Sequence, residues 1–145
     1  MARHLRGADL ILHAGDVCVP AVLEELSAYA PVHVVCGNND GPDVVAWGAP
    51  QSLELDLAGL RTAMIHDAGE RAGRAARLRR RFPDAELVVF GHSHIPMDLN
   101  PTDLTEVRIF NPGSPTDRRR QPHGTIGLLG IEEGRLMRAE IVPVD

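Results

Sequence analysis

The sequence has no long hydrophobic run. No apolar segment approaches the roughly 18–20 residues needed to cross a bilayer, and the N-terminus, MARHLRGADL, lacks the apolar core of a signal peptide. We therefore expect a cytoplasmic protein that does not contact membranes. The chain has 145 residues, of which 43% are hydrophobic, and this predicts one domain over residues 1–145.

Cysteine is also scarce. Only Cys18 and Cys36 occur, and their spacing matches neither a redox CxxC motif nor a zinc-binding set. This excludes a disulfide framework. It predicts two reduced thiols buried as small hydrophobic side chains, with metal contact or redox sensitivity as the alternative because both lie near motif loops.

Positive charge is in deficit, and lysine is absent. The 15 basic residues are all arginine and are outnumbered by 20 acidic ones, which gives a net charge of -5. This balance argues against general electrostatic binding of nucleic acid. The chain also lacks a basic groove with interleaved aromatic residues, so a nuclease is the weakest of the functions considered.

The first third of the chain alternates short apolar runs with a helical pattern. Residues 10–14 and 32–36 read as buried strands that stop at polar loops, and residues 19–30 carry apolar side chains at helical spacing. Together they predict a βαβ unit with two parallel neighbouring strands.

The remainder is rich in strand signals. We expect a loop over 41–50 anchored by Trp47, a hairpin over 52–66, a helix over 70–82 and strands at 86–90, 106–110, 125–131 and 136–142. The arginines of the predicted helix recur every three to four residues, which is typical of a solvated face. The fold class is therefore α/β, with mixed β-sheets sandwiched between helices.

Side chains that bind metals follow four of the predicted strands. They are Asp16, then Asn38 with Asp40, then His66, then His92 with His94. The loops at the carboxyl ends of parallel strands converge, so these side chains are expected to meet. Each alone is more often structural, but the ordered set of oxygen and imidazole groups predicts a site for Mn, Fe, Ni or Zn.

The ordered motifs Gly15-Asp16, Gly37 to Asp40 (GNND), His66 and Gly91 to His94 (GHSH) resemble those of the calcineurin-like metallophosphoesterase superfamily, especially its small bacterial and archaeal phosphodiesterase branch. The segment from Asn111 to Pro122 is similar to a loop of that branch. The resemblance implies a four-layer αββα sandwich with mixed β-sheets. It also implies two divalent metal ions, with manganese favoured over nickel, iron or zinc.

The resemblance further implies roles for individual residues. Asp16 would bridge both metals, Asn38, His66 and His92 would complete one site, and His94 would belong to the other. The implied activity is hydrolysis of a small phosphate ester, most specifically a phosphodiester, by a metal-activated hydroxide that attacks phosphorus in line.

Asn39 departs from the family pattern, which commonly has a histidine there to assist the leaving group. An amide cannot act as a general acid, so we expect Asn39 to hydrogen-bond a phosphate oxygen and leaving groups of low pKa to be favoured. Arg118 is a further candidate for substrate contact, because arginine suits phosphate oxygens.

No Asp-x-His motif precedes Asp16, although family members begin with a strand that ends in this motif. We therefore expect an N-terminally incomplete domain whose first strand is missing and whose second metal keeps only Asp16 and His94. An open sheet edge could then pair with another copy, giving a homo-oligomer. The alternative function is a non-catalytic protein-interaction module on the same scaffold, as in the retromer subunit that resembles this family.

Overall fold

The computed structural model describes residues 2–144 and begins with a short helix, α1 (Ala2–Leu5), followed by a βαβ unit. In that unit, β1 (Ile11–His13) and β2 (Val32–Val34) pair in parallel and are joined by α2 (Pro20–Ser27). Among the described strands, β2 is the one neighbour of β1. The predicted parallel pair is therefore confirmed.

A five-stranded mixed sheet forms the centre of the molecule. Its order is β3-β4-β5-β7-β6, with β3 (Ser52–Leu57), β4 (Leu60–Ile65), β5 (Leu87–Phe90), β6 (Met97–Leu99) and β7 (Arg108–Asn111). The strands β4, β5 and β7 are parallel, whereas β3 and β6 pair antiparallel at the edges. A separate antiparallel hairpin follows, made of β8 (Thr125–Glu132) and β9 (Arg135–Pro143).

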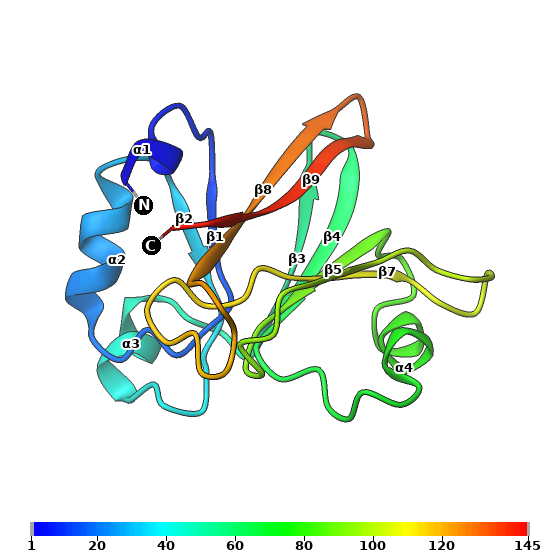
Figure 1. Cartoon of the computed structure of the whole chain (residues 1–145), viewed down its shortest axis with the longest axis horizontal. Helices are drawn as coiled ribbons and strands as arrows, with labels where there is room; N and C mark the ends of the chain where they lie inside the picture. The colour runs from blue at the N-terminus through cyan, green and yellow to red at the C-terminus, as the bar shows by residue number, and fades with distance from the viewer. Residues whose placement is uncertain (1, 145) are drawn as a thin grey trace.

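Three apolar clusters separate four layers (Figure 1). The helices α2 and α3 (Pro42–Trp47) pack on β2 through Leu23, Val34 and Val44. The faces of β1 and of the β8-β9 hairpin meet the five-stranded sheet around Met64 and Phe110. Helix α4 (Arg74–Arg81) covers the far face of that sheet. The predicted αββα sandwich with mixed sheets is confirmed.

Two local predictions were wrong. Residues 42–47 form the helix α3 rather than a loop, because Pro42 starts the helix and Gly48, with a φ of 121°, ends it. Helix α4 begins at Arg74 rather than at residue 70, since Gly69 and Gly73 have left-handed φ values of 78° and 68°. The edge strand β6 was not anticipated.

The arginines of α4 also differ from the prediction of a solvated face. Arg77 donates hydrogen bonds to the carbonyl oxygens of Ala68, Glu70 and Ala72. Arg74 stacks on the Phe90 ring, with its guanidinium carbon 4.9 Å from the ring centroid. These two side chains therefore hold the loop before α4 in place.

The thiols are not both buried. Cys36 is half-buried and Cys18 is exposed. The prediction for Cys18 was therefore wrong. Across residues 2–144, no helix has both the length and the apolar character needed to cross a bilayer.

Candidate metal centre

The loop after β1 brings Asp16 against the loop after β2. Gly15 and Asp16 both have left-handed backbones, with φ values of 101° and 58°. A Cβ on Gly15 would lie 2.6 Å from His66 Nδ1, and one on Gly37 would overlap Asp16. The glycines of the Gly-Asp and Gly-Asn-Asn-Asp motifs are therefore required by close approach of the two loops.

Asp40 ties these loops together. Its carboxylate accepts hydrogen bonds from the backbone N–H groups of Asp16 at 2.9 Å, Cys18 at 2.8 Å and Gly37 at 2.8 Å. Charged acceptors make the stronger class of hydrogen bond, so Asp40 can hold the left-handed turn that presents Asp16. The sequence interpretation listed Asp40 among the metal-binding side chains at the strand ends, whereas in the structure its carboxylate is engaged by backbone N–H groups.

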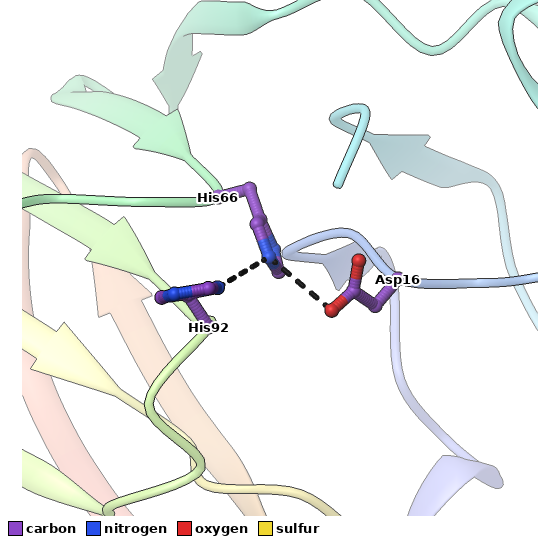
Figure 2. Close-up of side chains that lie close together, drawn as sticks. All are labelled: Asp16, His66 and His92. Atoms are coloured by element: carbon purple, nitrogen blue, oxygen red, sulfur yellow. Dashed lines mark hydrogen bonds and ion pairs between the residues drawn. The ribbon is translucent and has the colours of Figure 1, made fainter. Parts of the chain in front are cut away.

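Four predicted ligands converge at the carboxyl ends of β1, β2, β4 and β5. Asp16, His66 and His92 each offer one ligand atom, and these atoms all lie within 4.8 Å of one another (Figure 2). Asn38 Oδ1 lies between the two histidines, 2.9 Å from His66 Nε2 and 3.2 Å from His92 Nδ1.

The hydrogen bonds of His66 determine which of its nitrogens faces this cluster with a lone pair. Its Nδ1 lies 2.6 Å from the carbonyl oxygen of Ala14, which can only accept, so Nδ1 carries the proton. Neutral Nε2 then faces Asn38 Oδ1 and, at 3.3 Å, Asp16 Oδ2. All three atoms are electron-pair donors in this tautomer. Asn39 Nδ2 donates to Asp16 Oδ2 at 3.2 Å, and His92 Nδ1 can offer at most one further proton to Asn38 Oδ1 and His66 Nε2. A divalent cation can accept electron pairs from Asp16 Oδ2, Asn38 Oδ1 and His66 Nε2 at the same time, which a single proton cannot do.

His94 lies apart from these four ligands. Its Nδ1 donates to the carbonyl oxygen of Asp117 at 2.6 Å and lies 3.6 Å from the Asp117 carboxylate, so the ring is held against the loop over 112–124. The proton on Nδ1 leaves a lone pair on Nε2 that can bind a metal. The structure thus joins Asp16, Asn38, His66 and His92 in one cluster and holds His94 against Asp117 instead.

Comparison with known proteins agrees with this geometry. The model of the calcineurin-like phosphoesterase superfamily domain matches residues 1–134. The chain belongs to this superfamily. It is similar to a probable metallophosphoesterase of Methanothermobacter thermautotrophicus, with 34% identity over 140 residues that cover 94% of this chain and 77% of that protein.

Solved structures share the fold of this phosphoesterase domain. Zinc-bound wild-type Vps29 of Entamoeba histolytica matches with a TM-score of 0.77 at 21% identity, covering 99% of this chain and 86% of that one. An archaeal phosphodiesterase matches with a TM-score of 0.68 at 19% identity, covering 93% and 84%. At these identities the similarity demonstrates a common fold.

In this phosphoesterase domain, the two residues expected to bind substrate make local contacts. Asn39 donates to Asp16 through its backbone N–H at 2.8 Å and its amide Nδ2 at 3.2 Å. Arg118 donates to the carbonyl oxygens of Gln121 and Pro122. Asn39 is therefore an exposed residue in direct contact with Asp16, whereas Arg118 braces the loop that contacts His94.

Two further residues support the loops of the candidate site in this phosphoesterase domain. Asn111 is fully buried, donates to Gly91 O and Ser93 Oγ and accepts from Gly113 N–H, so it shapes the loop that carries His92. His13 Nδ1 accepts a hydrogen bond from Gly15 N–H at 3.2 Å. The loop-ordering role of Asn111 agrees with its place in an Asn-Pro-Gly turn, whereas no sequence signal distinguishes His13 from a packed core histidine.

Proposed function

We propose that this chain is a cytoplasmic, metal-dependent phosphoric ester hydrolase of the phosphodiesterase type, with manganese as the favoured ion. The observation that carries the proposal is the convergence of oxygen and imidazole ligand atoms from Asp16, Asn38, His66 and His92 at the carboxyl ends of four strands. Superfamily membership supplies the general activity, phosphoester hydrolysis. Two finer points are part of the proposal: the substrate is a diester rather than a monoester, and the metal is manganese rather than nickel, iron or zinc.

The proposal assigns one divalent ion to Asp16, Asn38, His66 and His92, and a second ion to Asp16 and His94. Bound metal ions supply positive charge for the phosphoryl oxygens and lower the pKa of water, which provides a nucleophile near neutral pH. Asp16 carries the one negative charge among the five proposed ligands, so its carboxylate would offset the repulsion between two dications.

Asn39 is proposed to orient the phosphate. Its Nδ2 carries two protons, and the one that is not directed at Asp16 Oδ2 can donate to a phosphoryl oxygen. Because an amide has no proton to transfer, the leaving group must depart as a stable anion. We therefore expect aryl phosphodiesters to be cleaved faster than alkyl ones. Arg118 is a weaker candidate for substrate binding, because it would have to break its hydrogen bonds to the carbonyl oxygens of Gln121 and Pro122 to reach the substrate.

The test is hydrolysis of bis-p-nitrophenyl phosphate by the purified chain, before and after chelation and with manganese restored. The expected result is turnover that requires the metal and is lost in His66→Ala. Arg80→Ala is the matched control, because Arg80 is an exposed residue at the far end of α4. Metal binding without any hydrolysis of mono- or diesters would contradict the proposed activity.

A non-catalytic interaction module remains the second candidate. The observation that favours it is the separation of His94 from the four-residue cluster, together with the fold shared with Vps29. Such a module would bind at most a structural ion and would keep its partner affinity in His66→Ala. Metal-dependent turnover that is lost in this variant would exclude it.

A further inference from the structure

The connection between β6 and β7 presents a leucine to solvent. Leu104 is 91% exposed, and the yellow loop to which it belongs projects beyond the sheet in Figure 1. Two carboxylates order this loop: Glu106 accepts from the N–H and hydroxyl of Thr102, and Asp103 accepts from the N–H and hydroxyl of Thr105. An ordered loop loses little conformational entropy when it binds.

A groove of about 130 Å³ lies beside the same loop, between α4 and β6. Apolar side chains that include Ala75, Met97 and Ile109 line it, and Arg71 and Arg74 flank it. Glu106 also lines it, with a carboxylate that already accepts hydrogen bonds from Thr102. In the part of the chain that the structure describes, neither arginine forms an ion pair with a carboxylate. The buried Nε of Arg74 has no hydrogen-bond partner. The groove therefore favours an apolar side chain that stands next to an anion.

The loop carries that combination of groups. Leu104 provides the apolar side chain, and the adjacent Asp103 provides the anion. Hydrogen bonds from Thr105 lower the pKa of Asp103, so this exposed carboxylate stays charged near neutral pH. Leu104 does not occupy the groove of its own chain, since it is almost fully exposed.

We propose that two copies of this chain form a reciprocal dimer, in which Leu104 of each copy enters the groove of the other and Asp103 faces Arg71 and Arg74. The loop and the groove lie at the same edge of the five-stranded sheet, where β6 has β7 as its one neighbour among the described strands. A twofold axis beside β6 can therefore bring each loop to the opposite groove. The dimer also covers an edge strand that would otherwise be open to aggregation.

The test is sedimentation velocity of the full chain over a concentration series. We expect a monomer–dimer equilibrium, and in Leu104→Asp a dissociation constant raised on the order of 100-fold, because two apolar contacts are lost per dimer. The exposed position of Leu104 should leave the melting temperature unchanged. Met137→Asp is the matched control, since Met137 is 63% exposed on β9 and should not alter association.

Mixing two defective variants tests the reciprocal arrangement. Arg71→Glu has an intact loop and Leu104→Asp has an intact groove, so an equimolar mixture should associate more tightly than either variant alone. A wild-type chain that is monomeric at all concentrations would overturn the proposal. So would a dimer that Leu104→Asp leaves unchanged, or a mixture that associates no better than its components.

Discussion

Asp40 offers the sharpest test of how the metal centre is built. Its carboxylate accepts three backbone N–H groups, from Asp16, Cys18 and Gly37. Each hydrogen bond to a charged acceptor contributes on the order of 1.5–3 kcal/mol, so removing all three should cost about 3–5 kcal/mol after allowance for partial exposure and non-additivity. This is a large fraction of the roughly 5–15 kcal/mol that stabilises a typical domain.

The perturbation is Asp40→Ala, measured by urea unfolding of the metal-free chain. The loss should appear as a lower midpoint at an unchanged slope, because the same surface is exposed on unfolding. Metal affinity should also fall, since Asp16 and Cys18 rely on Asp40 to keep their left-handed backbones, with φ values of 58° and 72°.

Asp43→Ala is the matched control. Asp43 accepts one backbone N–H, that of Val44 at 2.9 Å, in the first turn of α3. Its removal should cost about 0.5–1 kcal/mol. If Asp40→Ala proves no more destabilising than this control, then Asp40 does not hold the two loops together and the account of the site is wrong.

Three other predictions concern the same site. Asp16→Asn should abolish phosphodiester hydrolysis while the melting temperature stays near that of the Arg80→Ala control, and a comparable loss of turnover in both would indicate misfolding. Excess manganese should raise the melting temperature of the wild type by mass action, reversibly on chelation, and should have little effect on His66→Ala. Burial lowers the pKa of His13, against the attraction of Asp40 and Asp16, so the unfolded chain binds a proton that the native chain does not. The unfolding free energy should therefore fall as the pH drops below about 6.5, and His13→Asn, which keeps an acceptor for Gly15, should show a shallower fall in melting temperature.

Much of the fold follows from local patterns. The strands at β1, β2 and β5 were predicted because short apolar runs ended at polar loops, and the hairpin of β3 and β4 because a turn residue followed an alternating segment. The wrong predictions, the bounds of α3 and α4, occurred where glycine turns rather than amino-acid composition determine the local structure. Gly69 and Gly73 delay α4, and Gly48 ends a helix that the sequence alone left as a loop.

The sequence by itself determined the ligand chemistry and its order along the chain, because parallel strands present their carboxyl-terminal loops at one edge. It also identified the superfamily from the Gly-Asp, Gly-Asn-Asn-Asp and Gly-His-Ser-His motifs. The tertiary structure alone decided which ligands meet. Asn38 joins Asp16, His66 and His92, whereas His94 turns to Asp117.

Tertiary contacts also determined the tautomer of His66, the hydrogen bonds by which Asp40 joins two loops and the loop-bracing role of Arg77. Each of these depends on a backbone group that another part of the chain supplies. A side-chain pattern shows which residues can donate or accept, but it does not show which carbonyl or N–H will lie opposite them. That pairing is set by how the strands and loops pack, and so it became visible only in three dimensions.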